Sequence, residues 1–225
     1  MTKKGIIVAL AGNPNSGKTT VFNNLTGARQ HVGNWPGVTV EKKEGNRSFK
    51  GYSIKVVDLP GVYSLTAYSL DEVIARDYVV DEKPDVVVDV VDASNLERNL
   101  YLAVQLLEMG ANLVIALNMM DVAESRGYEV DVAELSYLLG TPVIPMVAAR
   151  NQGTQELLQA IVDIAEGNIK VSEISLQYGH DVEEEIAKLE KLISGKSPAQ
   201  GYSPRWLAVK LLEEDKEIIN KIRQA

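Results

Sequence analysis

Residues 12–19 read Gly12-Asn-Pro-Asn-Ser-Gly17-Lys18-Thr19, and they form the most informative segment of this 225-residue chain. The segment matches the pattern Gly-x-x-x-x-Gly-Lys-Ser/Thr, follows an apolar run at residues 6–11 and precedes a helical pattern at residues 18–26. Glycines that open the N-terminus of a helix after a strand let backbone N–H groups wrap around phosphate oxygens. The segment therefore predicts a phosphate-binding loop, in preference to a glycine-rich turn without a ligand.

The loop gives roles to individual side chains. Lys18 would reach the β and γ phosphates of a nucleoside triphosphate, and the Thr19 hydroxyl would bind Mg²⁺. The pattern leaves the position of Asn15 free, so this residue either supports the loop geometry or offers its amide oxygen to a monovalent cation. We expect the nucleotide to contact the whole segment and the residue that follows it, namely Gly12, Asn13, Pro14, Asn15, Ser16, Gly17, Lys18, Thr19 and Thr20.

Short apolar runs recur along the chain, and longer stretches with helical periodicity separate them. Runs that are rich in Val and Ile and do not alternate with polar residues are typical of strands buried on both faces of a parallel sheet. The expected strands cover residues 6–11, 54–57, 86–91, 113–117 and 143–147. The expected helices cover residues 18–26, 70–80, 95–109, 132–139 and 155–166, with Thr154 as the N-cap of the last. This alternation predicts a doubly wound α/β domain with a mostly parallel sheet, which we assign to residues 1–168.

Two parts of the chain do not fit this alternation. Residues 29–47 contain glycines and a proline but little apolar periodicity, so we expect a long functional loop that enters a strand at Val38. Residues 169–225 are expected to form a small all-helical domain, with amphipathic helices at residues 182–193 and 206–222. A turn-rich stretch at residues 195–204 separates these two helices.

The segment Asn118-Met-Met-Asp121 follows the expected strand at residues 113–117 and addresses the choice of base. The Asp121 carboxylate can accept two hydrogen bonds from the N1–H and amino group of guanine, whereas adenine offers no such pair of donors. Asn118 would tie the loop together and contact the base near N7, and Met119 would pack on the base. In a chain that also holds a P-loop, this segment favours a guanine site over a simple turn.

Three further segments complete the expected site. Asp58-Leu-Pro-Gly61 ends the strand at residues 54–57 and would place the Asp58 carboxylate beside Mg²⁺ and the Gly61 N–H beside the γ phosphate. Thr39, in the long loop, would complete the metal shell when a γ phosphate is present. The backbone of Ala148, Ala149 and Arg150 would contact the base. We expect a GTPase in which water attacks the γ phosphate in line, with Lys18, Thr39 and Gly61 as catalytic residues.

These five elements resemble the G1 to G5 boxes of small-GTPase domains within the P-loop NTPase fold. The segment Val32-Gly-Asn-Trp-Pro-Gly-Val-Thr-Val-Glu-Lys-Lys-Glu-Gly45 resembles the switch I region of FeoB, the prokaryotic ferrous iron transporter family. Other segments similar to that family are Asp58-Leu-Pro-Gly-Val-Tyr-Ser-Leu65, Asp71-Glu72, Ile74-Ala-Arg-Asp77, Glu97-Arg-Asn-Leu-Tyr-Leu102 and Ser203-Pro-Arg-Trp-Leu-Ala-Val-Lys-Leu-Leu212. The resemblance covers nearly the whole chain and is strongest through residue 168.

The resemblance implies a cytosolic G domain followed by a helical domain, which is GDI-like or a linker. Both would precede a polytopic membrane region of the same polypeptide. It implies that the nucleotide state regulates Fe²⁺ uptake and that the chain works at the cytoplasmic face of the cell membrane. It also implies K⁺ as the cation at Asn15, with backbone carbonyls of residues 33–37 closing its shell. Small cytosolic accessory proteins and a homo-oligomer are left open as further partners.

Three positions depart from the common GTPase pattern. Met119 replaces the usual Lys of the guanine motif, and Ala148 replaces the Ser that stiffens the last loop. Val62 stands where many GTPases have the Gln that orients the attacking water. We therefore expect weak retention of the nucleotide and slow intrinsic hydrolysis.

Composition separates the remaining alternatives. The net charge of −8 and the lack of a basic appendage argue against nucleic acid as a partner, and thus against a soluble RNA-associated GTPase of the ribosome-assembly or tRNA-modification kind. A switch that binds GTP without useful turnover is a third interpretation, which would follow if Val62 leaves no catalyst. The absence of cysteine excludes disulfides and thiolate metal sites and fits a reducing compartment.

Several polar or aromatic residues are not assigned to the site. Glu41 and Glu44 invite a role as iron ligands, but on a strand they would face opposite sides, so a solvated strand edge is favoured. The two histidines, His31 and His180, suggest no iron centre. Asp89 lies in a Val-rich strand, where a carboxylate is costly without a partner. Trp35 is either a mobile loop aromatic or a packing anchor.

Overall fold

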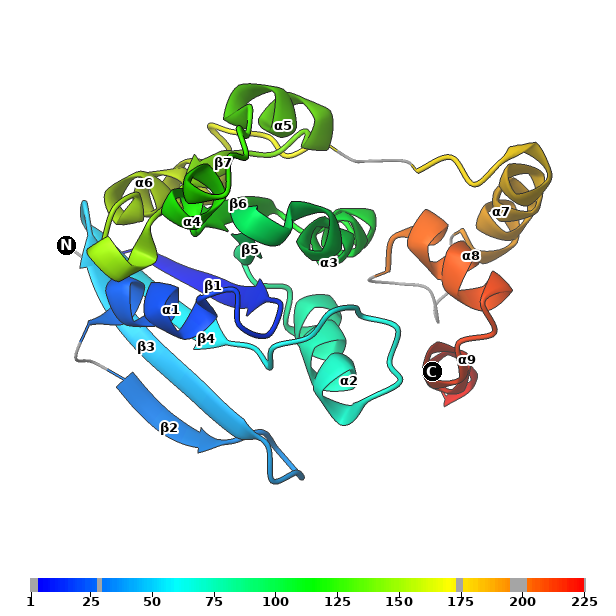
Figure 1. Ribbon diagram of the computed structural model, residues 1–225. Helices are drawn as coiled ribbons and strands as arrows, with labels where there is room; N and C mark the ends of the chain where they lie inside the picture. Colours follow the sequence, from blue (N-terminus) through cyan, green and yellow to red (C-terminus); the bar gives the residue numbers. More distant parts are fainter. Residues whose placement is uncertain (1–3, 28–29, 173–175, 195–201, 225) are drawn as a thin grey trace.

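A mostly parallel sheet with helices on both faces forms the body of the molecule (Figure 1). The computed structural model describes residues 4–27, 30–172, 176–194 and 202–224. Within these residues the sheet has seven strands in the order β2-β3-β4-β1-β5-β6-β7. Their bounds are β1 Gly5–Gly12, β2 Gln30–Asn34, β3 Glu41–Phe49, β4 Tyr52–Asp58, β5 Val86–Asp92, β6 Leu113–Asn118 and β7 Val143–Pro145. The predicted fold class is confirmed.

The register of the central strands brings the expected site together. Strand β1 pairs in parallel with β4 on one side and β5 on the other, so Val8 lies between Val56 and Val86. Strands β5, β6 and β7 continue in parallel. The carboxyl ends of β1, β4 and β6 therefore lie along one edge of the sheet, which is where open α/β sheets bind their ligands.

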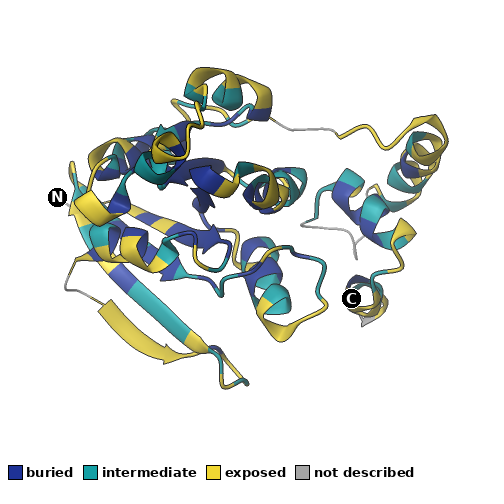
Figure 2. Cartoon of the chain, in the orientation of Figure 1, coloured by how far each residue is buried: buried dark blue, intermediate teal, exposed yellow. Residues whose placement is uncertain are grey.

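Two apolar layers cover the sheet, and side chains of β5 enter both. Val86, Val88 and Val90 pack with α1 (Lys18–Thr26) and α6 (Thr154–Ala165). The alternate residues Val87 and Val91 pack with α2 (Leu70–Asp77) and α3 (Leu96–Glu108). This two-sided burial explains why β5 is apolar except at Asp89 and at its last residue, Asp92 (Figure 2).

Short elements connect this framework. They are the π-helical turn η1 (Tyr78–Glu82), the 3₁₀ turns η2 (Ala93–Asn95) and η3 (Ala148–Arg150), and the helices α4 (Met120–Ser125) and α5 (Val132–Leu139). The helix predicted over residues 70–80 is thus α-helical to Asp77 and continues as η1, and the strand predicted to reach residue 147 ends at Pro145. Gly153, not Thr154, is the N-cap of α6, and the Thr154 hydroxyl donates to Asn151 instead.

The prediction of a long loop at residues 29–47 is wrong for most of that segment. Strands β2 and β3 form an antiparallel pair, with His31 opposite Glu44, and β3 also pairs with β4. The intervening residues 35–40 carry Thr39, and the strand begins at Glu41 rather than Val38. All five residues of β2 are exposed, so no apolar alternation marks this strand in the sequence.

The helical part contains α7 (His180–Ile193), α8 (Pro204–Leu212) and α9 (Lys216–Gln224). The prediction of one helix over residues 206–222 is wrong, because the chain turns at Glu214, whose φ is 53°. The Asp215 carboxylate then accepts hydrogen bonds from the N–H groups of Glu217 and Ile218 and starts α9. Residues 195–201 of the predicted turn-rich stretch lie outside the described residues. Among the residues that the structure describes, no helix combines the length and hydropathy needed to cross a bilayer.

Candidate nucleotide-binding site

The P-loop runs between β1 and α1 in the backbone geometry that the glycine pattern predicts. Gly12 and Gly17 have φ angles of 153° and 87°. A Cβ at Gly12 would stand 2.8 Å from the Val90 carbonyl oxygen, and a Cβ at Gly17 would stand 2.3 Å from the Asn118 amide nitrogen. Both positions therefore require glycine, because of the backbone angle and because of the neighbour.

Polar atoms inside this loop fit an anionic ligand. The Ser16 Oγ and Asn13 Oδ1 atoms are buried, and within the described residues neither has a hydrogen-bond partner. Buried polar atoms without partners are costly, so a loop that keeps them is suited to a ligand that supplies the missing bonds. The hydroxyl of Ser16 can donate to phosphate, and Asn15, Thr19 and Thr20 are exposed to solvent.

Lys18 reaches the end of β4. Its Nζ donates to the Asp58 carboxylate and, at 2.6 Å, to the Leu59 carbonyl oxygen. Only 12% of the Lys18 side chain and 11% of the Asp58 side chain are exposed, so each charge is neutralised by the other in a nearly closed position. The fold thus brings together the lysine and the carboxylate that the sequence assigns to phosphate and metal.

The Gly61 backbone also lies beside the P-loop. A Cβ on Gly61 would be 3.6 Å from the Pro14 Cα, and the Val62 N–H donates to the Gly12 carbonyl at 3.3 Å. Thr39, by contrast, is exposed, and in the described residues no hydrogen bond joins it to Thr19 or Asp58. Asp58 and Thr39 both carry oxygen atoms that suit Mg²⁺. Asp58 contacts Lys18 in this structure, whereas Thr39 lies apart from that pair.

Asn118 joins the P-loop to the loop after β7. Its amide donates to the Ser16 carbonyl at 3.0 Å and accepts from the Ala148 N–H at 2.9 Å, and the residue is only 4% exposed. Met119 follows in the left-handed conformation with a φ of 60°, and this turns the chain so that α4 begins at Met120. Asp121 lies in the first turn of α4, where the Arg150 guanidinium is 3.5 Å from its carboxylate. The predicted base-binding residues therefore lie in adjoining loops.

Two residues beside the site, Arg98 and Tyr63, belong to none of the five nucleotide motifs. The Arg98 guanidinium stacks on the Tyr63 ring, 4.0 Å from the ring centroid, and the Asn13 amide donates to the Arg98 carbonyl at 3.4 Å. Arg98 occurs in a segment that resembles the FeoB family, but a single arginine at the start of a helix is no motif. Only the fold shows that it meets the segment after Gly61.

Trp35 is a packing anchor rather than a mobile aromatic. It is 7% exposed, and its ring meets that of Tyr78 edge-on with centroids 5.4 Å apart. The Lys42 ammonium lies 4.8 Å from the centroid of the Trp35 ring. The segment that holds Thr39 is thus fixed at one end against the residue that follows α2.

Glu41 and Glu44 form ion pairs on β3. Glu41 pairs with Lys43 at 2.8 Å, and Glu44 pairs with Lys42 at 2.7 Å and Lys55 at 2.8 Å. In the described part of the chain, no group of three or more His, Cys, Asp or Glu side chains could hold a metal ion. These two glutamates therefore have lysine partners on the sheet.

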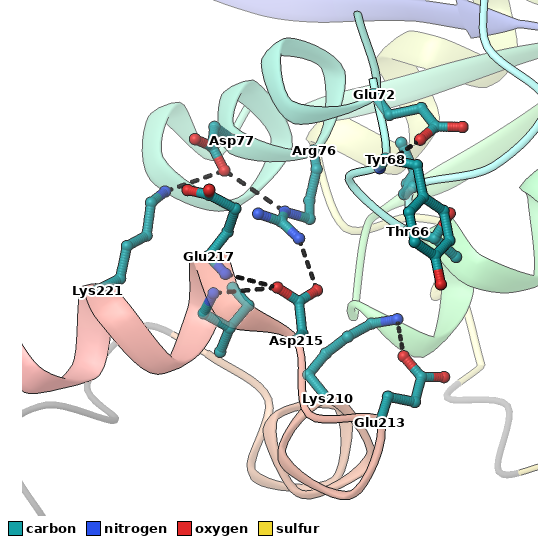
Figure 3. Close-up of polar contacts among 12 residues, drawn as sticks. Thr66, Tyr68, Glu72, Arg76, Asp77, Lys210, Glu213, Asp215, Glu217 and Lys221 are labelled. Carbon is teal, nitrogen blue, oxygen red and sulfur yellow. Dashed lines mark hydrogen bonds and ion pairs between the residues drawn. The ribbon is translucent and has the colours of Figure 1, made fainter. Parts of the chain in front are cut away.

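A second cluster joins α2 to the helical part (Figure 3). The Arg76 side chain is fully buried, its Nη1 lies 2.9 Å from the Asp215 carboxylate, and its Nε lies 3.5 Å from Asp77. Lys221 of α9 pairs with Asp77 at 2.9 Å and with Asp81 at 3.1 Å. The sequence gives no hint of these pairs, because Arg76 and Asp215 are 139 residues apart.

The parallel sheet, its P-loop and the loops at its carboxyl edge define a P-loop GTPase domain followed by a helical domain. The model of the family "Ferrous iron transport protein B" matches residues 6–161, and the model of the FeoB cytosolic helical domain matches residues 178–225. The chain belongs to the FeoB ferrous iron transport family.

Known members of this family are similar over almost the entire chain. A fusion of Fe(2+) transport protein A with Fe(2+) transporter FeoB from Porphyromonas gingivalis is 48% identical over 216 residues, which are 95% of this chain and 26% of that protein. The Fe(2+) transporter FeoB of Escherichia coli strain K12 is 46% identical over 216 residues, 94% of this chain and 27% of that protein. The chain thus spans about a quarter of the length of these relatives.

Solved structures agree with this assignment. The FeoB cytosolic domain of T. maritima in a GDP form is 43% identical, with a TM-score of 0.92 over 98% of this chain and 86% of that one. An N11A mutant of the S. thermophilus NFeoB bound to mGDP is 40% identical, with a TM-score of 0.88 over 96% of this chain and 82% of that one.

Proposed function

We propose that this chain binds and hydrolyses GTP and that its nucleotide state regulates the passage of Fe²⁺ through a membrane region of the same polypeptide. The family supports this proposal over a soluble RNA-associated GTPase. The observation that supports it is the contact of Asn118 with both Ser16 and Ala148, which joins the phosphate loop to the loops expected to bind guanine. Residues 1–168 would form the G domain and residues 169–225 the helical domain.

The proposed chemistry is attack of water on the γ phosphate. Lys18 exchanges its partner Asp58 for the β and γ phosphates, and backbone N–H groups of residues 15–18 and of Gly61 hold the phosphate oxygens. Thr19, Asp58 and Thr39 would hold Mg²⁺, which requires Thr39 to move from its exposed position. When bound, Mg²⁺ neutralises charge on the β and γ phosphates.

Asn15 is the proposed ligand of K⁺. Asn15 is exposed in a left-handed backbone conformation with a φ of 67°. A hard cation prefers oxygen ligands such as the amide oxygen of this side chain, and when bound K⁺ offsets negative charge near the phosphates. In the full-length protein, the chain would lie at the cytoplasmic face of the membrane, where accessory proteins and a second copy have access to it.

The first prediction is guanine selectivity that depends on Asp121. Guanine supplies two donors to its carboxylate, whereas adenine leaves the carboxylate unpaired at a cost of about 2 kcal/mol or more. Competition binding of GDP against ADP should favour GDP at least about thirtyfold. Asp121→Asn should lose this preference and gain xanthine nucleotides, whereas the exposed Glu124→Gln on the same helix should retain it. Equal affinities for GDP and ADP in the parent protein would contradict the proposed function.

The second prediction is stimulation of turnover by K⁺. Phosphate release from GTP should be faster in KCl than in NaCl at equal ionic strength, and Asn15→Ala should remove the difference. Asn46→Ala, at an exposed position of β3 outside the nucleotide motifs, is the matched control and should retain the difference. Equal rates in the two salts would refute a K⁺ site, and stimulation that survives Asn15→Ala would place the ion elsewhere.

A further inference from the structure

The segment after Gly61 is held against α3 at two points. The Tyr63 ring lies under the Arg98 guanidinium at 4.0 Å, and the Leu65 N–H donates to the Gln105 side chain at 2.7 Å. Arg98 and Gln105 are seven residues apart, so they lie on one face of the helix. Helix α3 therefore supports the residues that directly follow the proposed γ-phosphate contact.

The start of α3 is itself fixed to the phosphate loop. The Asn13 amide donates to the Arg98 carbonyl at 3.4 Å. The buried Asn99 accepts a hydrogen bond from the Asp92 N–H at 3.2 Å and donates to the Asn95 carbonyl at 2.9 Å, which fixes the helix to the end of β5. Arg98 thus projects from a fixed helix start onto the exposed Tyr63, whereas the neighbouring Val62 and Leu65 are buried.

Arg98 is exposed, and within the described residues its guanidinium forms no ion pair or side-chain hydrogen bond. Its contact with Tyr63, which is 40% exposed, is therefore its main interaction with the molecule. Val62, between Gly61 and Tyr63, is 5% exposed and donates its N–H to the P-loop at Gly12. A single buried residue, Val62, therefore separates the Tyr63 ring from the Gly61 backbone.

We propose that Arg98 is a positioning residue for GTP hydrolysis, which acts by holding Tyr63 and through it the Gly61 N–H that meets the γ phosphate. This inference rests on the proposed function. Arg98 acts through the aromatic face of Tyr63 and does not touch the phosphates. A lysine can replace part of this contact, because a cation over a ring does not need the guanidinium fork.

Four single variants and one double variant test the proposal by turnover. Arg98→Ala and Tyr63→Leu should each lower kcat about two- to fivefold, the range that one exposed cation–π contact supplies, with KM for GTP unchanged within about twofold. Tyr63→Phe keeps the ring and should retain kcat, and Arg98→Lys should recover part of it. The double variant Arg98→Ala with Tyr63→Leu should be no slower than either single variant, because both remove one contact.

Tyr101→Leu is the matched control, since Tyr101 lies on α3 three residues after Arg98 and is 55% exposed. It should leave kcat unchanged. Unchanged kcat in Arg98→Ala would overturn the proposal. A loss of about a thousandfold or more in Arg98→Ala, with normal kcat in Tyr63→Leu, would also overturn it, because Arg98 would then act on the phosphates directly.

Hydrogen exchange tests the positioning role without turnover. Backbone amides of residues 61–65 should exchange faster in Arg98→Ala and Tyr63→Leu than in the parent protein, and at the parent rate in Tyr101→Leu and Tyr63→Phe. Unchanged exchange would overturn the proposal even if the chain hydrolyses GTP. Faster exchange in a chain without GTP turnover would support the Arg98 contact while the proposed function fails.

Discussion

Asp89 is a carboxylic acid buried in the sheet among apolar side chains. It is 1% exposed on β5, and in the described residues neither carboxyl oxygen has a hydrogen-bond partner. It is paired in register with Ala11 on one side and Ile115 on the other, and Val87 and Val91 flank it on the same face of the strand. Burial in these apolar surroundings raises the pKa of Asp89 from its ordinary value of 3.8 to about 7.

This raised pKa predicts a loss of stability with increasing pH. Between about pH 4 and pH 7 the folded protein retains a proton that the unfolded chain has released, so the free energy of unfolding falls as the pH rises. The loss is absent below the lower pKa and complete above the higher one, where it is of the order of 4 kcal/mol at most. Asp89→Asn should therefore raise the free energy of unfolding more at pH 8 than at pH 5.

Urea denaturation of both proteins at these two pH values measures the difference. Glu156→Gln, an exposed carboxylate on α6, is the control and should change stability by little at either pH. An equal effect of Asp89→Asn at pH 5 and pH 8 would show that the carboxyl group is already ionised in the folded protein.

Among single residues, the sequence predicts those whose function depends on their spacing within a short motif. The P-loop glycines, Lys18 and Asp58 are recognisable because a phosphate site needs these residue types in one short order. Arg98 and Tyr63 are not recognisable, because their contact depends on a helix and a loop that lie 35 residues apart in sequence. Thr39 is an intermediate case. The sequence identifies the segment that contains it, but only the structure shows that its side chain is exposed.

The loop between β6 and α4 differs from the common GTPase pattern at Met119, and this difference should change the rate of GDP release. Met119 adopts a left-handed conformation there, and its Cε would lie 3.7 Å from a Cβ placed on Gly17. Its side chain thus packs beside the P-loop without a charge or hydrogen bond of its own.

We expect release of GDP to be fast without an exchange factor and slower in Met119→Lys, because a lysine stem packs equally well and adds a polar contact. Stopped-flow measurement of a fluorescent GDP analogue determines the rate. Met120→Lys on α4 is the control for added charge and should not slow release. Release that takes many minutes in the parent protein would show that Asn118 and Ala148 retain the base without help.

The same physical reasons decide which elements the sequence predicts. Strands buried on both faces, such as β5 and β6, are marked by continuous apolar runs. Strand β2 is exposed throughout and has no such mark, and helices α8 and α9 appear as one because neither glycine nor proline marks the turn at Glu214. Tertiary contacts, rather than periodicity, define these elements.

For the whole molecule, the main feature is a buried ion pair that joins helix α2 to the residue directly before α9. Arg76 is fully buried, and the side chain of its partner Asp215 is 7% exposed. Removal of one charge from a buried pair leaves the other uncompensated, which typically costs about 3–5 kcal/mol. Asp77, at 3.5 Å, offsets part of this cost.

Asp215→Asn should therefore lower the free energy of unfolding by about 3 kcal/mol, while its oxygen still accepts the hydrogen bonds at the start of α9. Lys221→Met, at a pair that is about one third exposed, should cost less than about 1 kcal/mol. Chemical denaturation compares the two variants under identical conditions. A cost for Asp215→Asn no larger than that for Lys221→Met would show that Arg76 is compensated by Asp77 alone.

The contact between Gly17 and Asn118 has a consequence for ligands smaller than a nucleotide. The Asn118 amide occupies the space beside Gly17 and bonds to Ser16, so the phosphate loop and the base loop are held together as one structural unit. Pyrophosphate and guanosine are the two fragments of the expected ligand. Each fragment, bound alone, must order this unit by itself, whereas a second fragment finds it already ordered. Fragment affinities in this protein should therefore be cooperative rather than additive.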